Sequence, residues 1–253
     1  MIDDEPKPTP PASDPSNRAH RDSSSPTPVE SLVIVALGDS TTDDLVWSDQ
    51  IDEVYAQCLP IALAERGIQA RVYNAGIGGT TTREARLRLE DDVLRHSPDL
   101  VIIQFGINDS WVDIDEGRYS PRLTRDEYRE NLRCLVRAIR AAGAQVVLMT
   151  PNPMRWSDPF YIDLFRRHPS MLDTRSERGM NALLDLYAQD VRDVALEQGV
   201  PLVDVHLAFE EYGKTPGCSI HNLLVAGDGI HPNTLGQRLV CQLLAAQIAA
   251  NLK

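Results

Sequence analysis

The chain has 253 residues, of which 42% are hydrophobic and 25% are charged, as expected of a globular protein with one large domain. Its formal net charge of −12 argues against nucleic acid as a partner, because phosphate backbones bind basic surfaces. No stretch reaches the ~18 apolar residues of a membrane span, and none has the apolar core of a secretion signal. We therefore expect a soluble protein with no integral membrane segment, cytoplasmic as the sequence stands and secreted only if a signal precedes residue 1.

Residues 1–30 differ from the rest of the chain in composition. They hold seven of the 17 prolines, at positions 6, 8, 10, 11, 15, 26 and 28, and three consecutive serines. A segment with so few apolar residues cannot bury enough surface to offset the entropy of ordering it. The composition predicts a disordered Pro/Ser-rich tail over residues 1–30 and a folded domain over residues 31–253.

Short apolar runs alternate with helical patterns along the folded part. The runs predict strands over residues 32–37, 70–75, 99–105, 144–150 and 200–205. The clearest helix carries Tyr128, Leu132, Leu135 and Ile139 at helical spacing and should stop at Gly143. Continuous apolar strands between amphipathic helices indicate an α/β protein with a parallel sheet covered on both faces.

Polar and glycine-rich motifs follow the predicted strands. "GDSTTDD" follows the first strand, "NAGIGGTTT" the second and "GINDSW" the third, and "DGIHPNTLG" lies some twenty residues after the last. Each motif alone has a structural explanation as a helix cap, a tight turn or a polar loop. Because ligands bind at the carboxyl ends of parallel strands, the four motifs together point to one site. They supply a serine nucleophile, a histidine base, a carboxylate and oxyanion donors, as acyl transfer requires.

The four motifs resemble the sequence blocks of the SGNH hydrolases, also called GDSL esterases and lipases, and the likeness spans Leu32 to Leu252. The resemblance implies a flavodoxin-like three-layer α/β/α sandwich with a five-stranded parallel sheet. It implies Ser40 as the nucleophile, with the catalytic triad completed by Asp228 and His231. The oxyanion hole would comprise the amides of Ser40 and Gly79 and the side chain of Asn108. No metal or organic cofactor is implied.

Some details of this assignment stay open at the sequence level. Thr41 stands where many members of the family have leucine, and a shift of one residue in the alignment would replace Gly79 by Gly78. Asp39, Asn74 and Asp109 are expected to brace the site through hydrogen bonds. A helix is expected to begin near Ser40, so that its amino end faces the developing negative charge.

Two other classes of protein fit parts of the sequence. A metal-dependent phosphohydrolase would use carboxylate and imidazole ligands. The candidates for that role are Asp39, Asp43, Asp44, Asp204, His206, Asp228 and His231. A binding module on an inactive hydrolase scaffold is the other class, against which the intact serine, asparagine and histidine argue. His206 competes with His231 as the base, but it should lie two residues from Asp204 on one strand, where the side chains point in parallel.

Two stretches resemble insertions that overhang the site, at residues 111–125 and 152–178. The second combines arginines with aromatic residues, which suit sugar rings, acyl chains or carboxylates, although a structural hairpin would look the same. We expect a serine esterase that acts on a small-molecule or carbohydrate ester, with an acyl group such as acetyl. Lysophospholipase or thioesterase activity is the alternative within the family. The sequence carries no indication of the oligomeric state.

Overall fold

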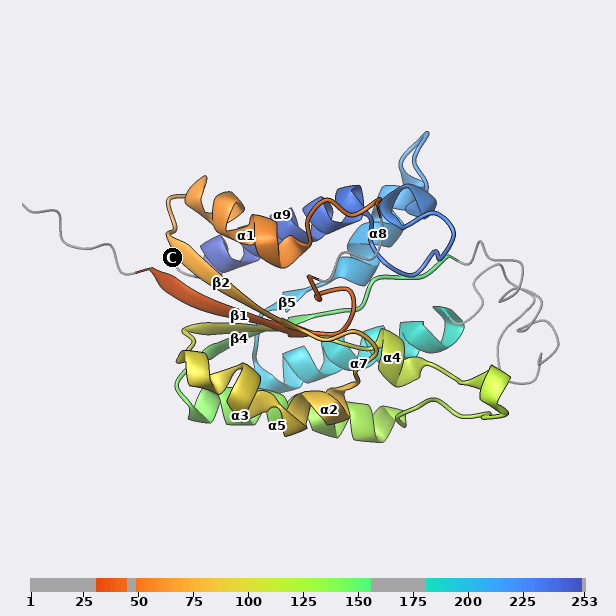
Figure 1. The fold of residues 1–253 in the computed structure, drawn as a ribbon, viewed down its shortest axis with the longest axis horizontal. Coiled ribbons are helices and arrows are strands. Elements are labelled where there is room, and N and C mark those ends of the chain that lie inside the picture. The colour runs from red at the N-terminus through yellow and green to blue at the C-terminus, as the bar shows by residue number, and fades with distance from the viewer. Residues whose placement is uncertain (1–30, 45–48, 156–180, 252–253) are drawn as a thin grey trace, which may run out of the picture.

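The computed structural model describes residues 31–44, 49–155 and 181–251. The predicted tail, residues 1–30, lies outside the described residues, as does most of the second predicted insertion. Five parallel strands form one sheet in the order β2-β1-β3-β4-β5 (Figure 1). They are β1 (Leu32–Gly38), β2 (Ala70–Gly76), β3 (Leu100–Gln104), β4 (Gln145–Met149) and β5 (Leu202–Val203). The predicted five-stranded parallel sheet is confirmed.

Helices cover both faces of the sheet and complete three layers (Figure 1). One face packs against α1 (Tyr55–Ala64), α8 (Val205–Lys214) and α9 (Thr234–Asn251). The other packs against α2 (Thr82–Leu87), α3 (Leu89–Asp92), α5 (Arg125–Ala141) and α7 (Asn181–Gln198). The short α4 (Ile107–Ser110) follows β3, and single turns of 3₁₀-helix lie at Leu94–His96, Ile114–Glu116 and Ile220–Leu223. None of the helices in these described ranges is long and apolar enough to cross a membrane.

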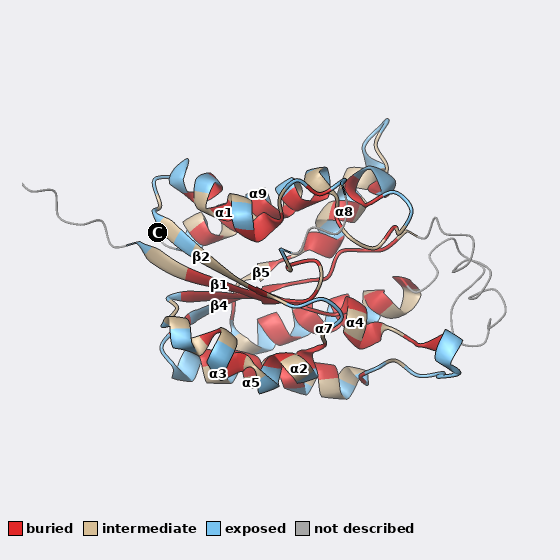
Figure 2. Ribbon diagram, in the orientation of Figure 1, coloured by how far each residue is buried: buried red, intermediate tan, exposed pale blue. Residues whose placement is uncertain are grey.

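The two covered faces explain why β1 is apolar at every position. Along β1, Ile34 and Ala36 belong to the core beneath α1 and α9, whereas Val35 and Leu37 belong to the core above α5 and α7. All four residues are completely buried, and β1 is red along this part in Figure 2. Side chains alternate between the faces of a strand, so a strand buried on both faces needs apolar residues without interruption.

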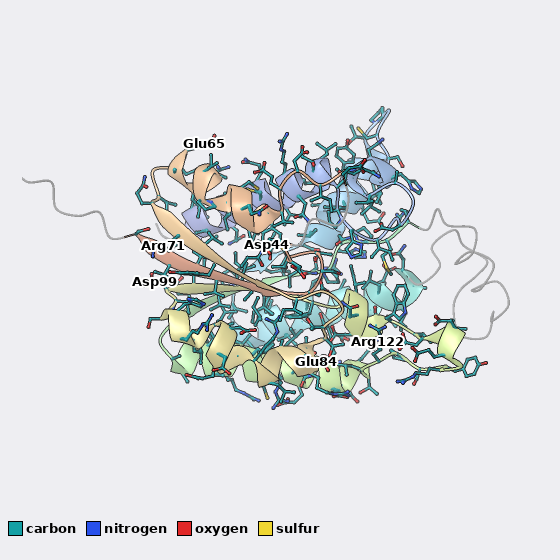
Figure 3. The ribbon with its side chains drawn as sticks, in the orientation of Figure 1. Asp44, Glu65, Arg71, Glu84, Asp99 and Arg122 are labelled. Atoms are coloured by element: carbon teal, nitrogen blue, oxygen red, sulfur yellow. The ribbon has the colours of Figure 1, made fainter. Side chains whose placement is uncertain are left out.

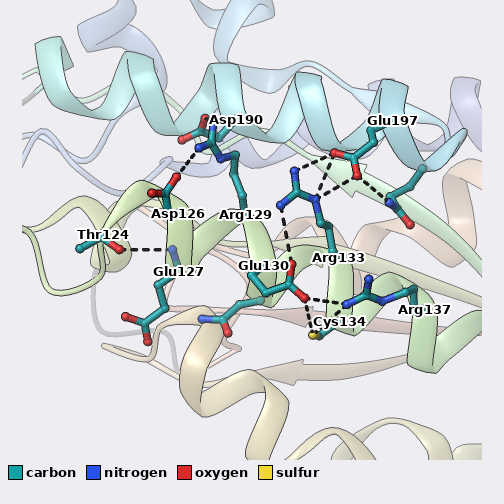
Figure 4. A network of polar contacts seen from close by, with 12 residues as sticks. Thr124, Asp126, Glu127, Arg129, Glu130, Arg133, Cys134, Arg137, Asp190 and Glu197 are labelled. Carbon is teal, nitrogen blue, oxygen red and sulfur yellow. Dashed lines mark hydrogen bonds and ion pairs between the residues drawn. The ribbon is translucent and has the colours of Figure 1, made fainter.

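Helix α5 follows the predicted apolar pattern. It begins after Thr124, whose hydroxyl accepts a hydrogen bond from the Glu127 backbone N–H at 3.2 Å. Its exposed side carries arginines and glutamates that form ion pairs within α5 and with α7 (Figure 4). At the start of α5, Arg125 binds the buried Asp190 of α7, and each carboxylate oxygen of Asp190 lies 2.7 Å from a guanidinium nitrogen.

The end of β5 differs from the prediction. The strand stops at Val203, and Asp204 caps α8 by accepting a hydrogen bond from the Leu207 N–H at 3.1 Å. His206 therefore lies in the first turn of a helix and not on a strand. The predicted strand over residues 200–205 is therefore too long. The valines in "VPLVDV" are equally compatible with a strand and with the buried start of a helix.

Candidate active site

Ser40 lies at the carboxyl end of β1, in a tight turn. The backbone N–H groups of Thr42 and Asp43 both donate to the Asp39 carbonyl, at 3.1 and 3.0 Å. A Cβ atom on Gly38 would lie 2.1 Å from Thr42 Oγ1, so glycine is required for this close approach. The prediction that a helix begins near Ser40 is wrong. Residues 40–42 form a turn, in which Ser40 is partly exposed.

The structure brings Ser40, His231 and Asp228 into a continuous chain of contacts. His231 Nε2 lies 2.8 Å from Ser40 Oγ, and His231 Nδ1 lies 2.7 Å from Asp228 Oδ2. The other oxygen of Asp228 accepts the N–H groups of Ile230, at 2.7 Å, and His231, at 3.2 Å. Because a carboxylate can only accept, Nδ1 carries the ring proton and Nε2 is left to accept the Ser40 hydroxyl proton.

Two potential oxyanion donors follow the strands on either side of β1. Asn108, in α4 after β3, has a buried Nδ2 atom that faces the Asp39 carboxylate, and a hydrogen bond from Asn108 opposes the rise in the pKa of Asp39. Gly79, after β2, is exposed and lines the same cavity as Ser40 and Asn108. The neighbouring Gly78 N–H already donates to Asp43 Oδ2 at 2.9 Å, which favours Gly79 over Gly78 as the donor.

The approach of α4 to the site depends on Gly106. This residue has φ of +138°, which side-chain-bearing residues rarely adopt. A Cβ atom there would also lie 2.9 Å from Pro151 Cγ and 3.1 Å from the Tyr128 hydroxyl. The first residue of "GIND" therefore allows the backbone to turn sharply into the helical turn that presents Asn108.

Buried polar residues brace the turns. Asp39 Oδ1 accepts hydrogen bonds from the Thr41 N–H and hydroxyl, both at 3.0 Å. Asn74 donates to the Thr42 carbonyl at 2.6 Å and accepts the Gly76 N–H at 2.9 Å. These contacts connect the turn after β1 with the end of β2.

Asp109 provides a second brace, between the ends of β2 and β3. Its Oδ1 atom accepts hydrogen bonds from the backbone N–H of Thr82, at 2.9 Å, and from the Thr82 hydroxyl, at 2.6 Å. Burial raises the pKa of Asp109 to about 7, although both Thr82 bonds act against the shift. Burial raises the pKa of Asp39 as well, and its charge adds to the shift at Asp109.

A cavity of about 650 Å³ opens above Ser40 and His231. Its lining includes Trp111, Asp113, Asp115, Glu116 and Arg122 from the first predicted insertion. Residues 111–125 therefore overhang the site, as expected. Of the second insertion, residues 152–155 are described and residues 156–180 are not.

The residues proposed as metal ligands do not gather at one point. Asp204 binds Arg192, with Nε 2.7 Å from Oδ2. Burial acts to raise the pKa of Asp204, but the contacts with Arg192, the Leu207 N–H and Thr150 together outweigh it and lower the pKa. His206 is buried with Nε2 3.1 Å from Asp185 Oδ1. Within residues 31–44, 49–155 and 181–251, no group of three or more His, Cys, Asp or Glu side chains is placed to bind one metal ion.

Arg122 and Asp113 are site residues that the motifs did not identify. Arg122 Nη1 donates to Asn108 Oδ1 at 3.3 Å, and the same guanidinium forms a bidentate ion pair with Asp113. Both residues lie in the connection between α4 and α5, which has no periodic pattern. The only feature of the sequence that could have indicated them is that an arginine and several acidic residues occur together within residues 111–125.

A parallel sheet with a Ser–His–Asp arrangement at its carboxyl edge defines the protein as an α/β serine hydrolase. Its sequence matches the GDSL-like lipase/acylhydrolase family over residues 36–239, and the chain belongs to that family. It is therefore a serine carboxylic ester hydrolase.

Similar proteins cover most of the chain. It is 34% identical to an uncharacterized lipoprotein, YqeF, of Bacillus subtilis (strain 168), over 82% of this chain and 85% of that protein. It is 31% identical to an acetylxylan esterase of Geobacillus stearothermophilus, over 70% of this chain and 72% of that enzyme. The structure resembles the lipase/acylhydrolase of Enterococcus faecalis with a TM-score of 0.65, at 27% identity over 87% of this chain and 96% of the other.

Proposed function

We propose that the protein hydrolyses neutral carboxylic esters with a small acyl group, such as acetyl on a carbohydrate, through an acyl-enzyme formed on Ser40. The observation that carries this proposal is the contact of Ser40 Oγ with His231 Nε2, at 2.8 Å, at the floor of an open cavity. A hydroxyl within hydrogen-bond distance of an imidazole that is itself oriented by a carboxylate can act as a nucleophile at neutral pH.

The reaction has two steps. As Ser40 Oγ attacks the ester carbonyl carbon, His231 Nε2 takes the hydroxyl proton and Asp228 stabilises the resulting imidazolium. The oxyanion accepts hydrogen bonds from the N–H groups of Ser40 and Gly79 and from Asn108 Nδ2. Collapse of the tetrahedral intermediate breaks the bond to the alcohol, which leaves with the proton from His231. Water, deprotonated by His231, then attacks the acyl-enzyme, and collapse releases the acid and returns the proton to Ser40.

The charge of the cavity supports a neutral substrate. Asp113, Asp115 and Glu116 contribute carboxylates to its wall, and Arg122, the arginine that lines it among the described residues, is paired with Asp113. A wall with excess negative charge repels the phosphates of acyl-coenzyme A or of a lysophospholipid. An acetylated sugar carries no such charge, and the similar acetylxylan esterase is named for a substrate of this kind.

Substitution of the nucleophile and a substrate panel test the proposal. Ser40→Ala should lower the rate on p-nitrophenyl acetate by about 10³-fold or more and prevent labelling by a fluorophosphonate. Wild-type kcat/KM should be highest for acetyl esters and acetylated xylooligosaccharides and should fall towards p-nitrophenyl palmitate. Faster turnover of palmitoyl-coenzyme A or lysophosphatidylcholine would contradict the substrate assignment. A Ser40→Ala variant that retained a tenth of the rate would contradict the mechanism.

A further inference from the structure

We propose that Arg122 is a positioning residue for the hydrolytic reaction: it holds the Asn108 side-chain amide so that Nδ2 points towards the oxyanion. This inference rests on the proposed function, because it requires Asn108 to be an oxyanion donor. Figure 3 shows Arg122 beside α4, the short helix that contains Asn108. Both residues line the cavity above Ser40.

An orienting group is needed because a terminal amide can rotate. The oxygen and nitrogen of an asparagine amide have similar size, and the torsion that exchanges them is soft and nearly two-fold. In the flipped orientation, the carbonyl oxygen of Asn108 would face the oxyanion and repel it. A productive site therefore requires an interaction that distinguishes Oδ1 from Nδ2.

Arg122 makes that distinction. Its Nη1 atom donates to Asn108 Oδ1 at 3.3 Å, and on the opposite side the buried Nδ2 faces the Asp39 carboxylate, where a hydrogen bond from Asn108 opposes the rise in the pKa of Asp39. The cation at Oδ1 and the carboxylate at Nδ2 therefore favour the same orientation of the amide. After a flip, the Nδ2 donor would face the guanidinium, a donor opposite a cation. The positive charge also draws electron density towards Oδ1, which makes the N–H groups of Asn108 better donors to an anion.

Asp113 fixes Arg122 in this position. The guanidinium donates from Nε to Asp113 Oδ2 at 3.0 Å and from Nη2 to Oδ1 at 2.7 Å. These bonds lower the pKa of Asp113 and leave Nη1 for Asn108. A lysine has one nitrogen in place of the planar fork and cannot hold the carboxylate at two points while reaching the amide.

A double-mutant cycle tests whether Arg122 acts through Asn108. Arg122→Met retains most of the aliphatic stem and removes every donor. Since the contact with Asn108 is long and partly exposed, we expect kcat on p-nitrophenyl acetate to fall by roughly tenfold, with KM nearly unchanged. In the Asn108→Ala background the same substitution should change kcat by less than about twofold, because the amide it positions is absent. Arg118→Met removes a cation from the same loop, one that pairs with the exposed Glu116, and should retain wild-type kcat.

Two further measurements separate positioning from folding and from substrate binding. Asp113→Asn weakens the clamp and retains the arginine, so it should lower kcat by about threefold in the wild-type background alone. Melting temperatures of all variants report any loss of folding. Equal loss of kcat from Arg122→Met in both backgrounds, or a change confined to KM, would overturn the inference. The proposed function would survive that result as long as Ser40→Ala is inactive and Asn108→Ala retains only a small, measurable fraction of the wild-type kcat.

Discussion

The buried carboxyl of Asp109 should stabilise the folded protein at acid pH, and this stabilisation should be lost as the pH rises towards neutral. Its carboxyl is completely buried, and burial raises its pKa from 3.8 to about 7. In the unfolded chain the group loses its proton near pH 4, whereas in the folded protein it holds the proton until about pH 7. Its contribution is therefore fully present below pH 4 and is lost progressively as the pH rises to about 7.

The size of the effect follows from the shift. A difference of about three pKa units corresponds to roughly 4 kcal/mol in total, of which about 2–3 kcal/mol falls between pH 5 and pH 8. In Asp109→Asn the side chain cannot ionise, and its oxygen can still accept both hydrogen bonds from Thr82. The new amide nitrogen would replace Oδ2, which is buried without a hydrogen-bond partner among the described residues, and would add a cost that is independent of pH.

Urea unfolding of both proteins at pH 5 and pH 8 measures the difference. The free energy of unfolding of the wild type should fall by about 2–3 kcal/mol relative to that of Asp109→Asn over this interval. Asp91→Asn, at an exposed position of α3, controls for the loss of one carboxylate. If the wild type and Asp109→Asn change in parallel with pH, to within about 0.5 kcal/mol, the buried carboxyl does not titrate as argued.

Two other substitutions separate catalysis from stability. His231→Ala should abolish both the acyl-enzyme burst and phosphonate labelling of the serine, whereas His206→Ala should reduce turnover by at most about tenfold; the opposite ranking would exchange their roles. Asp190→Ala removes the buried acceptor that Arg125 and Arg129 share; Figure 4 shows Asp190 beside Arg129. Since those arginines can reach water, we expect a loss of about 1–3 kcal/mol of stability by urea titration, with kcat retained; a change in kcat alone would contradict a purely structural role.

The parts of the fold that the sequence predicts are those that a local pattern decides. The strand around Val35 is apolar at every position because both faces of the sheet are covered, and the helix around Leu132 has a single apolar stripe. The sequence does not show where a strand ends and a helix begins when valines lie on both sides of the boundary, as Val203 and Val205 do here. At Asp204 the capping hydrogen bond, and not hydrophobicity, ends the strand.

The residues of the candidate site also fall into those that a local motif identifies and those that only the tertiary structure reveals. Ser40 and His231 lie in motifs whose glycine and aspartate neighbours are needed for the local turns, so short sequence blocks identify them. Arg122 reaches Asn108 from a connection that has no periodicity, and their contact depends on the path of the intervening chain. A contact of this kind depends on tertiary structure, and no spacing rule along the sequence predicts it.

The order of the strands explains why three loops converge on one ester. Strand β1 lies between β2 and β3, so the chain crosses from β1 to β2 on one side and then to β3 on the other side. The loops after β1 and β3 therefore diverge and leave a crevice at the carboxyl edge. Neighbouring strands are only about 4.8 Å apart, so the proposed donors in the loops after β2 and β3 are both close to Ser40. The hydrogen bonds that Thr82 donates to Asp109 connect the loops after β2 and β3, so the two proposed donors, Gly79 and Asn108, would be held relative to each other before a substrate binds.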